Sequence, residues 1–329
     1  EDGNTSDYYP TKVAYTVGDD DMEAEFSENS FLEQKDLTEK LVGQFFRTDE
    51  DFYRNNTEEA ITRNPKSLTP DEKKAKMYLV IVANTLDADI GASCIKDKDR
   101  TLKTFTDLAQ FMKIQFEPRV IFDNDFDKAH VDGAIQAIQP NPNDIVIFYY
   151  SGHGFTRNDK YTYPYMALTS KSFDGIDNSN SLNIQEVYNQ LNAKGARLTL
   201  VLSDCCNSDP NATNAEFGDV AATRTSGLKW NLDNCKALFL TQKRTSILMT
   251  AASRGELSAG TGNLGGIFTY NFRTSMVNYF VGGTKDDITW DNLLKDAQAQ
   301  TIKKAENTKC KEENGSTRQC VQHPVYQLP

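Results

Sequence analysis

Long hydrophobic runs are missing from this sequence of 329 residues. Its longest apolar stretches, at 144–150 and 198–202, are much shorter than the roughly 18 apolar residues of a membrane-spanning helix. We therefore expect a soluble chain with no membrane partner. A start at Glu1 suits both removal of a signal peptide and trimming of the chain, so the location stays open, with a secreted or periplasmic one slightly favoured over a cytoplasmic one.

Histidine and cysteine are also scarce, with three and six residues respectively. They do not show the spacing of zinc ligands, and the cysteines do not form the pattern of a small disulfide-rich scaffold. Cys310 and Cys320 flank a polar loop. They would pair in an oxidising compartment, and two unpaired thiols are an equally open alternative.

Basic charge is in deficit, with a formal net charge of −11. Residues 1–75 hold nine Lys and Arg against nineteen Asp and Glu, which gives 9 − 19 = −10 and leaves −1 for the rest. No basic face is available to neutralise phosphates, so nucleic acid is excluded as a partner.

The composition and the hydrophobic pattern of the sequence change after residue 75. Residues 1–75 are predicted to be an acidic N-terminal arm or prodomain. From 76 to 329, short apolar runs alternate with amphipathic stretches, which is typical of a doubly wound α/β domain with a parallel sheet buried on both faces. Strands are expected at 77–84, 119–125, 144–150, 196–204 and 246–253, and helices at 99–113, 127–139 and 183–193. The polar stretch 209–244 lacks periodicity and is expected to be a long loop between two strands.

Two apolar runs end in residues with ionisable or nucleophilic side chains. "IVIFYYSGHG" (145–154) places His153 between glycines, where its imidazole faces a cleft and a substrate backbone can approach closely; a solvated loop histidine is the alternative. "LTLVLSDCCNS" (198–208) ends in two cysteines. Alternation along the strand turns Cys205 into the core and Cys206 towards the crevice, where His153 would be the base that a thiol nucleophile needs.

These motifs resemble the histidine and cysteine boxes of the metacaspases and other caspase-like cysteine peptidases of clan CD. The resemblance covers residues 77–329 and extends to three further segments, which are "IGASCIKDKDR" (90–100), "ILMTAASRGELSAGTGNLGGIFTYNF" (247–272) and "QHPVYQLP" (322–329). It implies a caspase-like, mostly parallel six-stranded sheet with helices on both faces. It also implies a large-subunit-like part at 76–208, an inter-subunit loop at 209–244 and a small-subunit-like part at 245–329.

The same resemblance implies the catalytic roles. Cys206 would be the nucleophile and His153 its general acid and base, as a dyad with no third member. The backbone N–H groups of Gly154 and Cys206 would form the oxyanion hole, which stabilises the charge that develops on the scissile carbonyl.

Substrate specificity is expected to follow from charge. The family's acidic pocket for the residue before the cleaved bond maps onto Cys94, Asp97, Ser151 and Asp204. Two carboxylates there favour Arg or Lys. The alternatives are that Asp97 is an acid at a helix N-terminus and that Asp204 caps the following turn. A peptidase that cuts after Asp, which would need basic residues at these positions, is the runner-up.

Regulation is less constrained by the sequence. An enzyme of basic specificity could cut itself in the insert, at Arg224, Lys229, Lys243 or Arg244. The acidic arm, with Lys12, Lys35 and several tyrosines, could lie across the cleft as an inhibitor. As in most metacaspases, a monomer is expected.

No cofactor is expected to be required, and the metal content is unknown. Calcium as an activator stays open, because "SFDGIDNSNSLN" (172–183) offers only Asp174 and Asp177 where calcium takes six to eight oxygen ligands.

The sequence departs from the family pattern after the nucleophile, at Asn207, Ser208 and Asp209, and in a shorter loop at 253–261. A silent caspase-like scaffold therefore remains an alternative, although intact His153 and Cys206 argue against it. A different α/β hydrolase with an incidental Cys206 would need the G-x-S-x-G or G-x-x-x-x-G-K motifs that this chain lacks.

Overall fold

The computed structural model describes residues 12–17, 20–25, 67–169, 175–209, 230–281, 287–311 and 316–329. Contacts divide the chain into two compact units, Glu1–Lys66 and Ser67–Pro329. In the first unit, β1 (Lys12–Val17) pairs antiparallel with β2 (Asp20–Glu25). The division falls before the predicted boundary at residue 75, because Leu68 is buried in the core of the second unit and Glu72 lies 2.9 Å from Lys236 in an ion pair.

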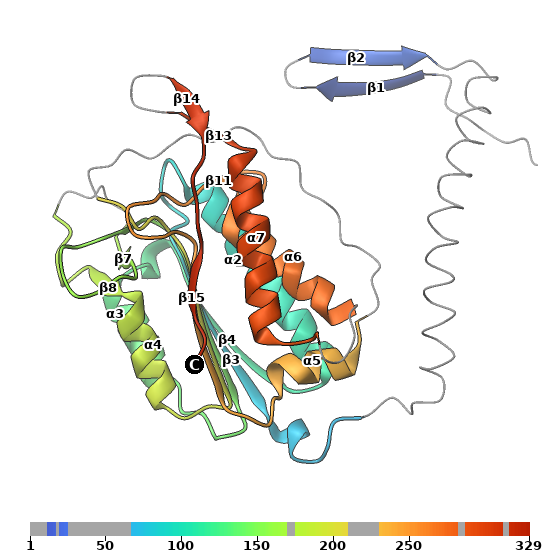
Figure 1. Cartoon of the computed structure of the whole chain (residues 1–329), viewed down its shortest axis with the longest axis vertical. Coiled ribbons are helices and arrows are strands. Elements are labelled where there is room, and N and C mark those ends of the chain that lie inside the picture. Colours follow the sequence, from blue (N-terminus) through green and yellow to red (C-terminus); the bar gives the residue numbers. More distant parts are fainter. Residues whose placement is uncertain are drawn as a thin grey trace, which may run out of the picture. The chain divides into compact units, whose positions relative to one another are not determined.

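A six-stranded sheet forms the centre of the second unit, in the order β15-β10-β9-β5-β3-β4 (Figure 1). Strand β15 runs antiparallel to β10, and the other neighbours are parallel. The strands are β3 (Lys76–Ala83), β4 (Gln115–Ile121), β5 (Ile145–Ser151), β9 (Leu198–Asp204), β10 (Thr245–Thr250) and β15 (Val325–Gln327). The predicted mostly parallel α/β sheet is confirmed.

Helices cover both faces of this sheet (Figure 1). One face carries α2 (Gly91–Met112), α5 (Leu232–Phe239), α6 (Ile267–Val281) and α7 (Trp290–Glu306), and the other carries α3 (Lys128–Ala137) and α4 (Ile184–Ala193). Side chains of a strand alternate between the two faces, so Ile147 and Tyr149 of β5 join the α2 side while Val146 and Phe148 join the α3 side. None of the helices in the described residues is long and apolar enough to cross a membrane.

Several helices begin at a side chain that accepts a hydrogen bond from a first-turn N–H group. These residues are Asp127 for α3, Asn183 for α4, Asn231 for α5 and Thr289 for α7. Such caps satisfy backbone donors that have no partner within the helix.

Helix α5 corrects the prediction of a structureless loop over 209–244. Cys235, Leu238 and Phe239 point from it into the core, so the second half of that stretch is part of the folded domain. At eight residues, the helix is too short for its periodicity to stand out from the polar sequence around it.

Short strands and turns complete the second unit. They are β6 (Gly154–Phe155) with β7 (Tyr165–Ala167) and β8 (Ser181–Asn183), β11 (Gly260–Thr261) with β12 (Gly265–Gly266), β13 (Lys309–Lys311) with β14 (Thr317–Gln319), and the 3-10 turns η1 (Glu72–Lys74) and η2 (Asp123–Asp125). The last hairpin contains a disulfide between Cys310 and Cys320, which decides the pairing that the sequence left open.

Candidate functional site

The predicted pocket residues lie together at the carboxyl end of the sheet. Ser151 and Asp204 are the last residues of β5 and β9 and pair in register. Their side chains face the α2 side, where the Ser151 hydroxyl donates to Oδ2 of Asp97 at 2.9 Å. Cys94, one turn before Asp97 on α2, joins them as a lining residue of a cavity of about 70 Å³.

His153 and Cys206 line the same cavity. The Ser258 N–H group donates to Sγ of Cys206 at 3.3 Å, and the thiol lies 3.9 Å from the carbonyl oxygen of Ser258. Burial raises the pKa of the Cys206 thiol to about 11, in spite of the opposing effect of the Ser258 N–H group and with a further rise from the charge of Asp204. The thiol is therefore neutral at pH 7 in this resting arrangement.

His153 has an acidic neighbour that the sequence analysis missed. Nε2 of His153 lies 2.9 Å from Oδ2 of Asp87, and each side chain is 11% exposed. Burial alone would raise the pKa of Asp87, but the hydrogen bond from His153 and N–H groups of Ile90 and Asp89 lower it to about 2. The sequence analysis expected no third member beside the dyad, and the structure places Asp87 next to His153.

A signal for Asp87 was present in the sequence. It stands in "ANTLDADIG", immediately beyond the strand at 76–83, and the carboxyl ends of neighbouring parallel strands meet at one edge of a sheet. Asp87 and Asp89 lie close together in this turn, and the sequence does not show which of the two meets the histidine.

Gly154 has a packing role in addition to the predicted one. A Cβ atom there would lie 2.4 Å from Sγ of Cys205 and 2.5 Å from the carbonyl oxygen of Cys206. The glycine thus lets the loops of His153 and Cys206 approach each other, and the space that a Cβ atom would take is filled by protein. Cys205 itself is 2% exposed and packs in the core on the α3 side, as alternation predicted.

The two acids of the pocket are almost fully enclosed, with Asp97 2% and Asp204 6% exposed. The Gly266 N–H group donates to both carboxylate oxygens of Asp97, at 3.0 and 3.1 Å. Asp204 accepts the hydroxyl of Ser258 at 2.6 Å and both the N–H (2.9 Å) and the hydroxyl (2.6 Å) of Thr269. Burial and repulsion from Asp204 raise the pKa of Asp97 well above its usual range, and burial raises that of Asp204.

These contacts overturn both alternative explanations of the acids. Asp97 lies beyond the first turn of α2 and points into the protein, so it is no solvated acid at a helix N-terminus. Asp204 accepts from residues 54 and 65 positions further along the chain instead of capping the turn that follows it.

The loop after Cys206, where the sequence departs from the family pattern, is held by internal hydrogen bonds. Asn207 is buried; its N–H group donates to the carbonyl of Glu256 at 2.9 Å and its side chain to the carbonyl of Thr162 at 3.0 Å. Ser208 is buried as well. The departure therefore leaves a well-packed loop, and Cys206 keeps its place in the cavity.

Several of the other predicted sites lie outside the described residues, and Asp177, Lys243 and Arg244 are not among the residues that line this cavity. Arg224, Lys229, Lys35 and Asp174 fall outside the described residues. Lys12 begins β1 in the first unit, and Lys243 and Arg244 are exposed just before β10, where Arg244 donates to Oδ1 of Asn192 at 2.8 Å. Asp177 accepts the N–H and hydroxyl groups of Ser179, and the described part of the chain contains no cluster of three acidic, histidine or cysteine side chains suited to a metal ion.

Comparison with known proteins agrees with the fold. The family model described as "Caspase domain" matches residues 77–322. A search of curated proteins returns no match. The family match spans most of the chain and includes every residue that lines the cavity. The chain therefore belongs to the caspase-domain family of clan CD cysteine peptidases.

Proposed function

We propose that this chain is a cysteine endopeptidase that cleaves peptide bonds after Arg or Lys. The observation that carries the proposal is the placement of two buried carboxylates, Asp97 and Asp204, in the cavity that also holds the Cys206 thiol. A cationic side chain that enters this cavity would meet both negative groups within reach of the nucleophile.

The proposed reaction uses Cys206 and His153. As the peptide binds, His153 takes the thiol proton and the thiolate attacks the scissile carbonyl carbon. The N–H groups of Gly154 and Cys206 stabilise the oxyanion. His153 then returns the proton to the leaving amine, and a thioester remains. Water, deprotonated by His153, hydrolyses the thioester and restores the thiol. Asp87 stabilises the imidazolium at both stages.

The charge around the cavity favours a basic substrate over an acidic one. Among the described residues that line it there is no Lys or Arg to receive an aspartate side chain. Arg273, which is partly buried, interacts with the carboxylate of Asp97 and donates to the Thr104 hydroxyl at 3.0 Å. Two carboxylates and one guanidinium leave one negative charge uncompensated when both acids are ionised. A single substrate cation would balance it.

The test is hydrolysis of short fluorogenic peptides that end in Arg, Lys or Asp. Cleavage after Arg and Lys is expected for the native chain, with loss of all activity in Cys206→Ala. Cys235→Ala, which removes a buried thiol far along the chain in α5, is the matched control and should retain activity. Cleavage after Asp would replace the proposed specificity, and no cleavage of any peptide would favour a silent scaffold.

Further parts of the proposal concern regulation. Autoprocessing would occur at Arg224, Lys229, Lys243 or Arg244 and would appear as fragments of defined mass in the native chain and not in Cys206→Ala. We also propose a monomer, which light scattering tests. Activity in calcium and in chelator decides whether calcium is an activator.

A further inference from the structure

Gln322, in the C-terminal segment, has a polar amide side chain that is buried in the protein. It is 1% exposed and lies between the disulfide hairpin and β15. Its Oε1 accepts the N–H group of Ala259 at 3.0 Å, and its Nε2 donates to the carbonyl of Ala251 and to the hydroxyl of Ser258, both at 3.2 Å. One side chain thus joins the two ends of the loop that runs from 251 to 259. Buried amides that satisfy both their donor and acceptor atoms fix local geometry.

That loop touches both halves of the proposed site through Ser258. Its N–H group donates to Sγ of Cys206, and its hydroxyl donates to Asp204. A hydroxyl has one proton, so Ser258 gives it to Asp204 and accepts from Gln322. The amide therefore fixes the direction of a chain of hydrogen bonds that ends on a pocket carboxylate. The Ser258 N–H group also opposes the rise in the pKa of Cys206 that burial causes.

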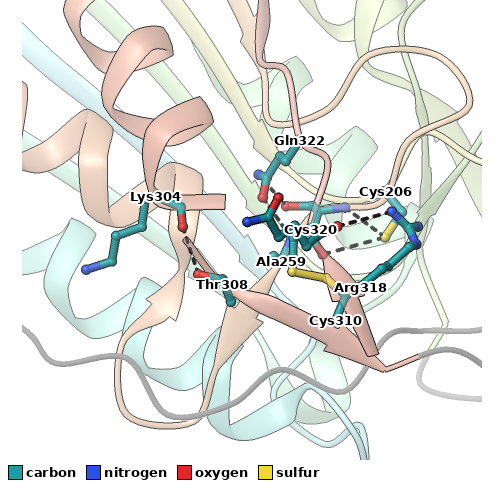
Figure 2. The surroundings of a disulfide bond; sticks show 10 residues. Cys206, Ala259, Lys304, Thr308, Cys310, Arg318, Cys320 and Gln322 are labelled. Carbon is teal, nitrogen blue, oxygen red and sulfur yellow. Dashed lines mark hydrogen bonds between the residues drawn. A yellow bond between two sulfur atoms is a disulfide. The ribbon is translucent and has the colours of Figure 1, made fainter. Parts of the chain in front are cut away.

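The disulfide also supports the loop that contains Ser258. Cys310 and Cys320 form a small buried cluster with Ala305, and Leu257, which precedes Ser258, packs against it. Figure 2 shows Gln322 and Ala259 side by side above this cross-link, with Cys206 nearby. The segment that carries Gln322 is thus cross-linked two residues before the amide.

The next residue along the segment adds a second attachment to the loop. The N–H group and Nδ1 of His323 lie 2.8 and 2.6 Å from the carboxylate oxygens of Glu256. The carbonyl oxygen of Glu256 accepts the N–H group of Asn207, next to the nucleophile. Two successive residues of the C-terminal segment thus contact the loop that holds Cys206.

We propose that Gln322 is a positioning residue of the peptidase, whose amide holds the 258–259 backbone so that the Cys206 thiol and the Asp204 carboxylate keep their places. This inference rests on the proposed function where it links Asp204 to substrate recognition. Its link to Cys206 is independent of the substrate.

The experiment compares Gln322→Met and Gln322→Glu with the native chain. Methionine keeps the size and removes every hydrogen bond, whereas glutamate keeps an acceptor for Ala259 and loses the donor to Ser258. Gln298→Met is the matched control, because Gln298 donates to the same segment at the carbonyl of Pro324 (2.6 Å). Melting temperatures and circular dichroism report the folding of each variant.

Two readouts are used. In kinetics with an Arg peptide, both Gln322 variants should lose roughly 10- to 100-fold in kcat/KM, the scale that misplacement of reacting groups produces. In the substrate-free protein, the pH midpoint for alkylation of Cys206 by iodoacetamide should shift upwards. Gln298→Met should change neither quantity. If Gln322→Met does not fold, Gln322→Glu decides by the same measurements.

The outcomes separate the inference from the proposed function. Gln322 variants that match the native chain in kcat/KM and in the alkylation profile, whatever their melting temperature, would overturn the positioning role. If the native chain cleaves no Arg peptide but the alkylation midpoint shifts in the Gln322 variants alone, the positioning role stands and the Arg specificity fails.

Discussion

Asp87 gives His153 a fixed orientation in a site where two residues were expected to act alone. The pKa of the carboxylate is lowered to about 2, so Asp87 remains a constant negative neighbour of the imidazole around neutral pH. A neighbour of this kind stabilises the imidazolium that forms when His153 takes the thiol proton. The contribution of Asp87 should therefore appear in kcat more than in KM.

We predict that Asp87→Asn lowers kcat by about 100-fold, the lower end of what general acid–base catalysis contributes. The amide keeps the shape and loses the charge, so KM for an Arg peptide should change little. Steady-state kinetics against pH measures both. Asp89→Asn is the control, because the exposed Asp89 contributes only its N–H group to Asp87. Equal kcat in the two variants would show that His153 works without its acidic neighbour.

The buried acids predict a pH dependence of substrate affinity. A raised pKa means that Asp97 still carries a proton at pH values where an exposed carboxylate is ionised. An Arg side chain binds the ionised form, so KM for Arg peptides should fall as pH rises above about 4 and level off above the raised pKa. Asp97→Asn should raise KM and flatten this dependence.

Asp107→Asn, at a position on the other side of α2, is the control for the Asp97 prediction. Asp107 is paired with Lys103 on the exposed face of the helix and should leave the KM profile unchanged. A KM that is independent of pH in the native chain would argue against direct contact between the substrate cation and Asp97.

At the residue scale, sequence reasoning worked where the signal was local. Strand ends and motif order brought His153, Cys206 and the four pocket residues to one cavity, because residues at the carboxyl ends of adjacent parallel strands are necessarily neighbours. Asp87 was missed because Asp89 in the same turn obscured it, and Gln322 was missed because its partners are 63 to 71 positions away and depend on the path of turns and loops. Periodicity does not specify such paths.

At the element scale, the long strands and amphipathic helices were predictable and the short pieces were not. Runs such as β5 are apolar on both faces and leave no doubt about their burial. Strands of two or three residues, such as β6, β11 and β13, are formed by tertiary contacts rather than by their own pattern. The 251–259 loop is likewise held by tertiary contacts, which come from the C-terminal segment.

Removal of the disulfide should weaken the support that the C-terminal segment gives to the 251–259 loop. The bridge closes a loop between residues ten positions apart, and a cross-link of that size contributes about 2–3 kcal/mol to the free energy of unfolding. Cys310→Ser with Cys320→Ser should lower stability by that amount in chemical denaturation monitored by fluorescence. Cys94→Ser is not a suitable control, because Cys94 lines the cavity; Cys235→Ala replaces a free thiol and serves instead. Equal stability of the double variant and the native chain would contradict the prediction.

For the whole molecule, the division at residues 66 and 67 matters for any truncation. Removal of residues 1–66 should leave the melting temperature of the second unit unchanged, whereas removal of residues 1–75 should reduce its stability by about 2–4 kcal/mol, because it deletes the buried Leu68 and the Glu72 ion pair. Calorimetry of the two truncated chains measures the difference.

Peptidase activity of the same truncated chains tests the proposed inhibitory arm. Higher activity without residues 1–66 is expected if the arm blocks the cleft, and unchanged activity would refute that role. The shorter truncation is the informative one, since loss of activity without residues 1–75 would only report a damaged core.

The chain contains cysteines in two different oxidation states, a free thiol and a disulfide, close to the same loop. In the proposed reaction Cys206 attacks the substrate as a reduced thiol, whereas Cys310 and Cys320 support the loop beside it as a disulfide. A dithiol reductant strong enough to protect the first would at high concentration open the second. Activity should therefore pass through a maximum as the redox poise of the medium is varied, and in Cys310→Ser with Cys320→Ser it should rise to a plateau under reducing conditions instead.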